Sequence, residues 1–460
     1  MIFLFNYLKL ALWSGIYYYQ RSDLVFDIII KNINDCGCLA IKFTQWLLPK
    51  IELIYDLDSK EDKWFGELER FYEYNNIHGL KHTEDTYKND FNEGIEETYE
   101  IQEIIGSGSI GQVYKVKHKI TGGLYAIKVT HPNMRGQILF LKYVLFFLMK
   151  TPLIKDKFCS MLPFNLYDFI NDFKDQTDMV HEANNCMKFY EFHKEDELVV
   201  IPRVSKVSRN ILIMSYEEGV RFDDLDISDY SKYKCIVLIN SFIKNNQIIT
   251  NFSHGDIHKG NWKIRVCGNK CFLILYDFGF CWKMPYEDIG MIEFIDNTFI
   301  KMDNGNQYTE DIIKISKFLL SEKCSDELIR NEMDGITMTI NPDVLFKFII
   351  AIAQKERIVL DSILLQVLIC LTQLTKYLEK YSLIRSEKTY ETGYLGYEYY
   401  RKRLLDIKSF CESNKIFKEY VAYIDEKIKK YNPEINDLFE TVETENNFKD
   451  CSFLKEMALS

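Results

Sequence analysis

Glycine and proline are scarce in this sequence, with 21 glycines and 8 prolines among 460 residues. Their combined share is about half of the usual 12% or so, which favours long helices over a turn-rich β fold. Basic residues are also in the minority, because 57 Lys and Arg stand against 68 Asp and Glu, for a net charge of −11. This balance excludes a generally basic nucleic-acid-binding protein, so we expect no nucleic-acid partner.

Cysteine pairs with the C-x-x-C spacing are absent as well. The twelve cysteines are scattered, and the closest pairs, Cys36/Cys38 and Cys267/Cys271, lack the C-x-x-C spacing of a zinc site. We interpret them as reduced thiols of an intracellular protein. The N-terminus has no arginine-rich transit signature. The expected location is therefore intracellular, with the cytoplasm and an organelle (mitochondrial) membrane both open.

No uninterrupted apolar run of membrane-spanning length is present. Residues 2–19 are rich in large apolar side chains, but Asn6, Lys9, Ser14 and Gly15 interrupt them. A cleaved signal peptide is therefore not expected. Two interpretations stay open: a tilted or interfacial membrane anchor, and an amphipathic helix that packs on the protein. The run at 363–374 is too short to span a bilayer and predicts a core helix.

What the sequence contains is a globular composition, with 47% hydrophobic and 27% charged residues. Apolar spacing predicts two or three helices within 24–80, and the polar segment 82–97 follows as a boundary. Strands are predicted at 98–105, 113–116, 124–129, 201–207, 211–216, 262–266 and 272–276, with a hairpin turn at Gly122-Gly123, and helices at 138–149, 166–192 and over most of the chain after 227.

These patterns predict an α+β fold with two lobes. The expected domains are a helical N-terminal extension at 1–95, an N-lobe at 96–216 with a helical insertion at about 133–164, a mainly helical C-lobe at 217–385, and a C-terminal region with an acidic tail at 386–460.

A glycine-rich segment fits the pattern G-x-G-x-x-G-x-V of loops whose backbone N–H groups close over phosphates. It lies between two predicted strands, which disfavours a Rossmann dinucleotide site. The predicted nucleotide-binding residues are Gly106, Ser107, Gly108, Ser109, Gly111 and Val113, with Lys128, Met214 and Tyr216 on later strands. They predict ATP as the bound nucleotide.

Lys128 lies in the strand segment Tyr-Ala-Ile-Lys-Val, which matches the strand whose lysine contacts the α- and β-phosphates. Such a lysine needs an acidic partner. Asp178 and Glu182 lie four residues apart on a predicted helix, so they share one face. We predict Glu182 as the partner of Lys128.

A second set of motifs follows. His254 to Asn261 has the spacing H-x-D-x-x-x-x-N of a kinase catalytic loop, and Asp277-Phe278-Gly279 lies beyond it. Asp256 is expected to accept or orient the proton of the attacking group, while Asn261 and Asp277 are expected to bind Mg²⁺. Phosphoryl transfer needs such a set, because a lysine and a metal ion must neutralise the moving phosphate. We predict His254 and His258 to brace the loop.

Together these motifs resemble the UbiB-like, or aarF-domain, atypical kinases, which are linked to isoprenoid-quinone (coenzyme Q) biosynthesis. The resemblance covers about residues 39–282. The family's K-x-G-Q motif appears as Lys42-Phe43-Thr44-Gln45, its S-I-G-Q-V-Y loop as Ser109 to Tyr114, and its E-x-D…E-A-x-N helix as Gln176-Thr177-Asp178 and Glu182-Ala183-Asn184-Asn185.

This resemblance implies an ATP- and Mg²⁺-dependent kinase or ATPase whose extension covers the substrate groove. It implies regulatory roles for Lys42, Gln45, Gln176 and Asp178, with Lys42 in contact with Asp178. Thr44 replaces the family's glycine, and we expect its β-branched side chain to resist a positive φ. Gln176 replaces the first acid of E-x-D. Glycines stand where many family members have an alanine-rich nucleotide loop.

Two alternatives remain beside the atypical kinase. The H-G-D-x-H-x-G-N loop also occurs in small-molecule phosphotransferases such as the aminoglycoside and choline kinases, and a pseudokinase scaffold could bind nucleotide without turnover. No A-P-E motif follows Asp277, so a peptide-docking segment is not expected. Besides ATP, the possible partners are a membrane surface and a lipid or quinone precursor.

Overall fold

A computed structural model gives the architecture of the chain. It describes residues 2–54, 66–68, 77–152, 163, 165–194, 196, 198–248, 250–258, 260–267, 270–285, 291, 294–295, 309–320, 324–333, 342–366 and 369. The C-terminal region predicted at 386–460 lies outside the described residues, as do parts of the predicted insertion at 133–164 and most of the core helix predicted at 363–374.

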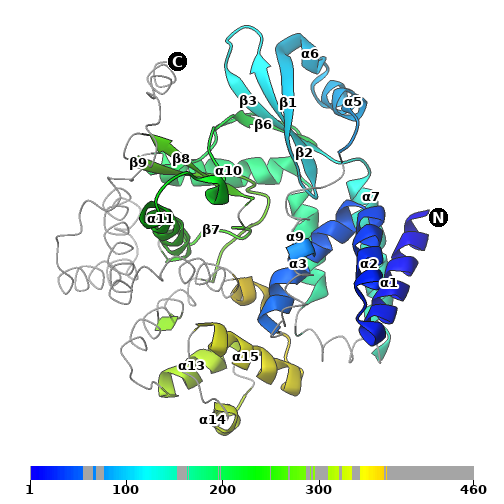
Figure 1. Cartoon of the computed structure of the whole chain (residues 1–460), viewed down its shortest axis with the longest axis vertical. Helices are drawn as coiled ribbons and strands as arrows, with labels where there is room; N and C mark the ends of the chain where they lie inside the picture. Colours follow the sequence, from blue (N-terminus) through cyan, green and yellow to red (C-terminus); the bar gives the residue numbers. More distant parts are fainter. Residues whose placement is uncertain are drawn as a thin grey trace, which may run out of the picture. The chain divides into compact units, whose positions relative to one another are not determined.

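Helices and strands follow the order shown in Figure 1. The helices are α1 (Ile2–Gln20), α2 (Asp23–Cys36), α3 (Cys38–Ile54), α5 (Leu80–Phe91), α6 (Ile95–Thr98), α7 (Met134–Met149), α9 (Leu166–Gln176), α10 (Met179–His193), η2 (Phe222–Asp224), α11 (Asp229–Ile248), α13 (Thr309–Leu319), α14 (Asp326–Met333) and α15 (Pro342–Glu356). The strands are β1 (Tyr99–Ser107), β2 (Gly111–His118), β3 (Leu124–Thr130), β4 (Val199–Val200), β5 (Val204–Val207), β6 (Ile211–Ser215), β7 (Ser253–His254), β8 (Trp262–Cys267), β9 (Lys270–Leu275) and β10 (Cys281–Trp282).

The chain divides into two compact units, and α10 contributes to both. Unit 1 comprises Met1–Asn184, Val204–Tyr216 and Asp343–Ser362, and unit 2 comprises Asn185–Arg203, Glu217–Pro342 and Ile363–Ser460. Each unit is described by itself below.

Unit 1 contains an antiparallel sheet with the strand order β1-β2-β3-β6-β5. Its first three strands are the ones predicted from the sequence. Gly122, in the turn between β2 and β3, has φ +71°, a conformation that glycine adopts without steric penalty. The predicted hairpin is therefore confirmed.

The two faces of this sheet bury different side chains, because successive residues of a strand point to opposite faces. Ile127 and Val129 of β3 join Tyr87 of α5 in one apolar cluster, whereas Ala126 packs in another cluster with Ala183 of α10. Lys128 therefore belongs to the face of Ala126 and α10. The segment 82–97, expected as a boundary, contains α5 and α6, and the buried Tyr87 ties it to the sheet.

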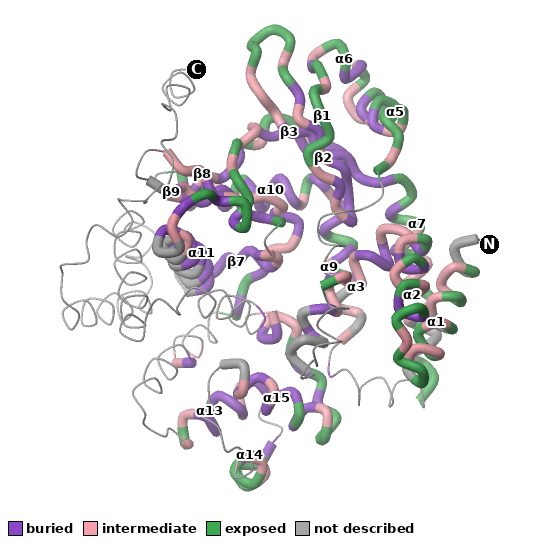
Figure 2. The backbone as a smooth tube through the Cα atoms, in the orientation of Figure 1, coloured by how far each residue is buried: buried purple, intermediate pink, exposed green. Residues whose placement is uncertain are grey.

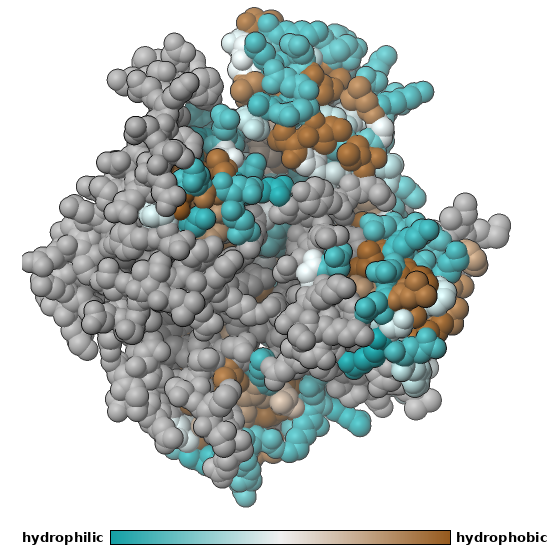
Figure 3. Space-filling view, viewed as in Figure 1, coloured by the Kyte–Doolittle hydropathy of each residue, from teal (hydrophilic) through white to brown (hydrophobic). Residues whose placement is uncertain are grey.

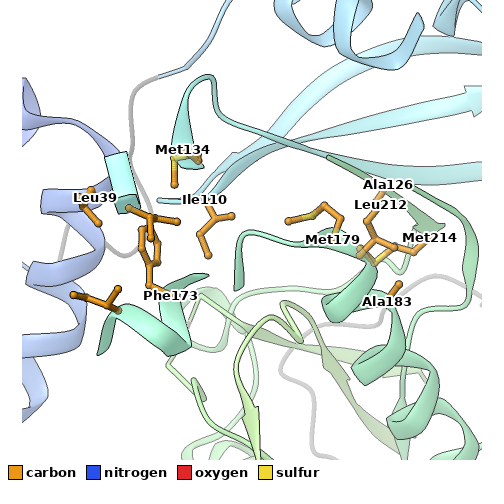
Figure 4. Close-up of a cluster of buried hydrophobic side chains, with 11 residues drawn as sticks. Leu39, Ile110, Ala126, Met134, Phe173, Met179, Ala183, Leu212 and Met214 are labelled. Atoms are coloured by element: carbon orange, nitrogen blue, oxygen red, sulfur yellow. The ribbon is translucent and has the colours of Figure 1, made fainter. Parts of the chain in front are cut away.

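The second cluster joins the N-terminal extension to the glycine-rich loop. Leu39 of α3 is buried with Ile110 of the loop, Met134 of α7 and Phe173 of α9 (Figure 4). Figure 2 shows the corresponding buried stretches in β2 and β3. The position of the loop thus depends on apolar packing from helices far away in the sequence.

The helix predicted over 166–192 is interrupted, so this prediction is wrong at its centre. α9 ends at Gln176 and α10 begins at Met179. Asp178 lies at the junction, where its Oδ1 accepts a hydrogen bond of 3.1 Å from the Val180 N–H. Aspartate is favoured as such an N-cap because it satisfies an N–H that lacks a partner within the helix. Asp178 and Glu182 are therefore not an i, i+4 pair inside one helix.

Unit 2 contains two small sheets, with the orders β4-β9-β8 and β10-β7, and the long helix α11. β8 and β9, which match the strands predicted at 262–266 and 272–276, pair antiparallel. Aromatic side chains pack at its centre, with the Phe189 ring 5.3 Å from that of Phe278 and 6.0 Å from that of Phe242. The predicted α+β class is confirmed, with helices before the sheet of unit 1 and α7 inserted after β3.

Candidate active site

A buried ion pair lies at the centre of unit 1. Lys128 Nζ is 2.8 Å from Glu182 Oε1 and 2.9 Å from Oε2, and both side chains are nearly inaccessible to solvent. The strand alternation directs Lys128 towards α10, and Glu182 lies in the first turn of that helix, where a negative charge is favoured. The pairing expected from the sequence is thus present.

The glycine-rich loop turns between β1 and β2. Gly106 and Ser107 end β1, and the Gly108 N–H donates to the Gly111 carbonyl at 3.0 Å. At Gly111 a Cβ atom would lie 2.6 Å from the Val129 carbonyl oxygen, so the close approach of β3 requires glycine. Val113 pairs with Lys128 in the β2–β3 register. The glycine-rich loop therefore leads into β2, the strand that pairs with the strand of Lys128.

His131, which the sequence analysis did not identify, holds the glycine-rich loop through hydrogen bonds. His131 Nε2 lies 2.9 Å from the Gly108 carbonyl oxygen, and the His131 N–H donates to Ile110 O at 2.9 Å. Its Nδ1 is 2.8 Å from Nδ1 of His78, whose Nε2 is 3.0 Å from Thr83 Oγ1. His131 thus contacts the backbone of the loop at two points.

The chemistry of the Gly108 carbonyl fixes the protons along this chain. A carbonyl only accepts, so His131 Nε2 carries the hydrogen and, in the neutral ring, Nδ1 accepts from His78. His78 Nε2 must then accept from Thr83, whose hydroxyl lies 2.7 Å from Tyr114 OH. Burial and its neighbouring histidines lower the pKa of His78 to about 4, and burial lowers the pKa of His131. Both rings are therefore neutral near pH 7.

The remaining predicted nucleotide contacts lie along the same sheet. Met214 pairs with Ala126 across β6 and β3, and the Tyr216 N–H donates to Leu124 O at 3.1 Å. Met214 is buried, and Val113 and Tyr216 pack beside it in the second apolar cluster. This apolar surface is of the kind that accommodates a planar base.

The Lys42–Gln45 motif lies in α3, and its glutamine reaches the glycine-rich loop. Ser109 Oγ donates to Gln45 Oε1 at 3.1 Å, and both residues are buried. The expected conflict between Thr44 and a positive φ does not arise, because position 44 lies within a continuous helix and its hydroxyl donates to Ala40 O at 2.9 Å. A threonine is therefore compatible with this backbone.

The segment Gln176–Asp178, which corresponds to the E-x-D motif of the family, lies at the junction of α9 and α10 and not inside one continuous helix. Gln176 is buried at the end of α9, and Asp178 Oδ2 lies 3.4 Å from Arg209 Nε. The contact of Lys42 with Asp178 stays a prediction.

In unit 2, two histidines fix the loop that contains Asp256. His254 Nε2 donates to Tyr276 O at 3.0 Å, and its Nδ1 accepts from the Asp256 N–H at 3.2 Å. His258 Nδ1 accepts from the Gly260 N–H at 3.0 Å, and its Nε2 is 3.8 Å from Asp256 Oδ1. Burial lowers the pKa of His254. The predicted bracing role of both histidines matches these contacts.

Asn261 and Asp277 offer oxygen atoms suited to Mg²⁺. Asn261 Nδ2 donates to Asp256 O at 2.8 Å, so its Oδ1 is the atom of that amide that can bind a cation. Asp277 Oδ1 accepts from the Gly279 N–H at 3.3 Å. Within the described residues, no group of three or more His, Cys, Asp or Glu side chains could hold a metal by itself. One carboxylate and one amide fit Mg²⁺, which commonly completes its shell with phosphates and water.

Comparison with known proteins assigns the family. Residues 76–306 match the model of the ABC1 atypical kinase-like domain, and the chain belongs to this family. The match includes the glycine-rich loop, Lys128, Glu182 and the two motifs of unit 2.

Two curated relatives come from Arabidopsis thaliana. The protein Activity of BC1 Complex Kinase 3, chloroplastic, is 26% identical over 194 residues, which are 40% of this chain and 26% of the relative. An uncharacterized aarF domain-containing protein kinase, chloroplastic, is 26% identical over 184 residues, or 38% and 25% of the two chains. The matched region thus spans about a quarter of these relatives.

A solved structure is also similar, the complex of Rv3197 with erythromycin from Mycobacterium tuberculosis. It has a TM-score of 0.39 and 16% sequence identity, over 73% of this chain and 86% of the other. The family assignment rests on the family model.

Proposed function

We propose that this protein is an atypical kinase or ATPase that binds ATP with Mg²⁺. The observation that carries the proposal is the buried pair of Lys128 and Glu182 on the face of the sheet next to the glycine-rich loop. Burying two charges is unfavourable unless they are closely paired, so a surface-exposed strand lysine does not explain this arrangement. A phosphate-binding lysine does, because its glutamate fixes the position of its positive charge.

Each residue then has a defined task. Lys128 neutralises phosphate charge, and backbone N–H groups between Gly106 and Gly111 bind phosphate oxygens. Asp256 accepts or orients the proton of the attacking hydroxyl or water. Asn261 and Asp277 would hold Mg²⁺, which would neutralise the charge that develops on the transferred phosphoryl group.

Two substitutions in unit 2 separate binding from chemistry. Asp256→Asn should reduce turnover by about 10²–10⁴-fold and leave ATP affinity unchanged. Asp277→Asn should instead weaken the Mg²⁺-dependent part of ATP binding, because it removes the negative charge that attracts the ion. Phosphate release and nucleotide titration with and without EDTA measure the two effects. Normal turnover in Asp256→Asn would exclude that residue from the chemistry.

The same assay addresses the alternatives. A small-molecule phosphotransferase should transfer phosphate to a choline- or aminoglycoside-type hydroxyl, and a pseudokinase should bind ATP without releasing phosphate. The buried Gln45–Ser109 contact supports the UbiB-like proposal, because it places the family motif of α3 on the loop. We therefore propose a lipid or quinone precursor as the substrate, in support of isoprenoid-quinone or lipid metabolism. Two relatives are described as chloroplastic, which supports an intracellular, organelle-associated location.

We further propose that the N-terminal helices bind a membrane surface. On α1, Phe5, Leu8, Leu12 and Tyr19 are exposed at helical spacing, and no acidic residue interrupts them. α7 exposes Leu139, Tyr143 and Phe146 together with Arg135 and Lys142, and the exposed Lys150 follows directly after its end. The helices are in contact, because the rings of Tyr7 and Phe140 lie 6.3 Å apart. Apolar side chains gather over the N-terminal helices in Figure 3. No helix in the described part of the chain is long and apolar enough to cross a bilayer.

Flotation with liposomes tests this proposal. A chain that begins at Ser22 and the full-length variant Leu8→Asp should both lose most of their binding to anionic vesicles. Ile120→Asp serves as the control, because Ile120 is an equally apolar side chain that is 91% exposed in a turn of unit 1. Equal flotation of the wild type and Leu8→Asp would contradict the proposal.

A further inference from the structure

Asp277 has an uncommon backbone conformation. Its φ is +55°, in the left-handed region that residues other than glycine seldom occupy. Aspartate tolerates this region better than most side chains, but the surrounding structure has to maintain it. The direction of the Asp277 carboxylate follows from this backbone and from the Gly279 N–H, which donates to Asp277 Oδ1. Contacts that hold the backbone from Tyr276 to Gly279 therefore also set the position of the carboxylate.

The carbonyls of Tyr276 and Phe278, one residue before and one residue after Asp277, are held by buried side chains. The Tyr276 carbonyl accepts from His254 Nε2 at 3.0 Å, and the Phe278 carbonyl accepts from Asn185 Nδ2 at 2.9 Å. Cys281 Sγ also donates to Phe278 O, at 3.4 Å. Asn185 is only 4% exposed. Loss of its amide would therefore leave a buried carbonyl with only a weak thiol donor.

The helix that carries Asn185 contacts the same segment a second time. Phe189 lies one turn further along α10, and its ring is 5.3 Å from the ring of Phe278. Glu182, the partner of Lys128, precedes Asn185 by three residues on this helix. One helix therefore supplies both the partner of Lys128 in unit 1 and the side chain that holds Phe278 O in unit 2.

We infer that Asn185 is a positioning residue, which holds the Phe278–Gly279 peptide group so that its N–H keeps the Asp277 carboxylate in place to bind the metal ion. This inference rests on the proposed Mg²⁺-dependent ATP binding. Its amide does not contact the ion itself; it acts through the backbone between Asp277 and Gly279. Outer-shell partners of this kind usually change metal affinity by about 10–100-fold when they are removed.

The chain supplies a matched control next to the residue. Asn184 has the same side chain on the same helix, but it is exposed. In full-length protein, Asn185→Ala should weaken the affinity for Mn²⁺, titrated at a fixed ATP concentration, by about 10–100-fold, and Asn184→Ala should match the wild type. ATP affinity in EDTA should be the same in all three proteins. Asn185→Asp, similar in size but without the amide donor, should resemble Asn185→Ala.

Hydrogen exchange provides a second measurement that needs neither ATP nor a metal. Amides of residues 276–282 should exchange faster in Asn185→Ala than in Asn184→Ala, because the backbone brace is lost. If Asn185→Ala does not fold, Asn185→Asp replaces it in both measurements. Equal Mn²⁺ affinity and equal exchange in folded variants would overturn the inference. A wild type that binds no ATP would instead overturn the proposed function, and the exchange comparison would still decide whether Asn185 holds the segment.

Discussion

The two units hold their functional side chains by different interactions. In unit 1, Lys128 is fixed by an opposite charge, with both Glu182 oxygens within 2.9 Å. In unit 2, neutral side chains bind the backbone of the carboxylate-bearing loops, as His254 binds Tyr276 O and Asn261 binds Asp256 O.

The difference follows from what each group has to do. A phosphate-binding cation must be held near an anion before the nucleotide arrives, because an isolated buried ammonium would lose its proton. A metal-binding carboxylate has to keep its negative charge available for the ion. Its position is therefore better fixed by hydrogen bonds to the neighbouring backbone than by a cationic partner. We therefore expect unit 1 to be the more sensitive to loss of one charged partner.

The largest effect should come from breaking the buried pair. Lys128→Ala leaves Glu182 buried without that partner and should reduce the free energy of unfolding by about 3–5 kcal/mol. Glu103→Ala is the control, because Glu103 is exposed in its ion pair with Lys115, at 3.6 Å, and this pair should contribute about 1 kcal/mol or less. Urea denaturation measures both. Equal losses in the two variants would contradict the importance of burial.

The double variant Lys128→Met/Glu182→Leu sharpens the same comparison. It removes both charges and should recover most of the stability that Lys128→Ala loses, since an apolar pair of similar size avoids the desolvation of two ions. Like Lys128→Ala, the double variant lacks the proposed phosphate-binding lysine, so it should bind no ATP. Recovery of stability without recovery of binding would separate the structural role of the pair from its function.

A neutral contact in unit 2 should have a smaller effect. Asn251 donates to Met284 O at 2.8 Å and accepts from the Met284 N–H at 2.9 Å, with φ +46°. Asn251→Ala should lose about 1–3 kcal/mol of unfolding free energy. Asn251→Gly should lose less than Asn251→Ala if backbone strain matters, because glycine adopts a positive φ readily. If Asn251→Ala lost more unfolding free energy than Lys128→Ala, unit 2 and not unit 1 would be the more sensitive to loss of a single contact.

Lowering the pH should destabilise unit 1 through its hydrogen-bonded histidines, His78 and His131. The pKa values of His78 and His131 are lowered on folding, so between about pH 6.5 and pH 4 the unfolded chain binds more protons than the folded one. Stability is therefore complete above the unfolded pKa and falls as the pH decreases towards the folded pKa. The thermal midpoint of His78→Gln should fall less steeply over this interval than that of the wild type. Parallel curves would show that His78 does not contribute to the acid sensitivity.

The smallest effects are expected at the extension. Gln45→Ala removes one buried hydrogen bond to Ser109 and should weaken ATP binding by several-fold, corresponding to about 1 kcal/mol. We expect Lys42→Ala to change ATP affinity or autophosphorylation to a similar or smaller extent. The intact protein should not phosphorylate generic peptides. Peptide phosphorylation by the wild type, together with unchanged ATP affinity in both variants, would show that α3 does not guard the site.

Much of the site could be predicted because its motifs are local. The strand with Lys128, the glycine-rich loop and the Asp256 loop each depend on residues within a few positions, so spacing alone indicates their chemistry. The break at Asp178 could not be predicted as readily, because an aspartate is compatible with a helix interior and with an N-cap. His131 follows directly after β3, but its contact with Gly108 depends on how the loop turns back.

By itself, then, the sequence determined the α+β class, the first three strands of the sheet in unit 1, the identity of the charged groups and the choice of Glu182 as the partner of Lys128. Only the tertiary structure decided how these groups are held. It placed Gln45 against Ser109, joined His78 to His131, and directed Asn185 to the carbonyl after Asp277. The physical reason is that a hydrogen bond between residues 53 to 93 positions apart leaves no periodic trace in the sequence, since it depends on the packing of whole helices and strands and not on local spacing.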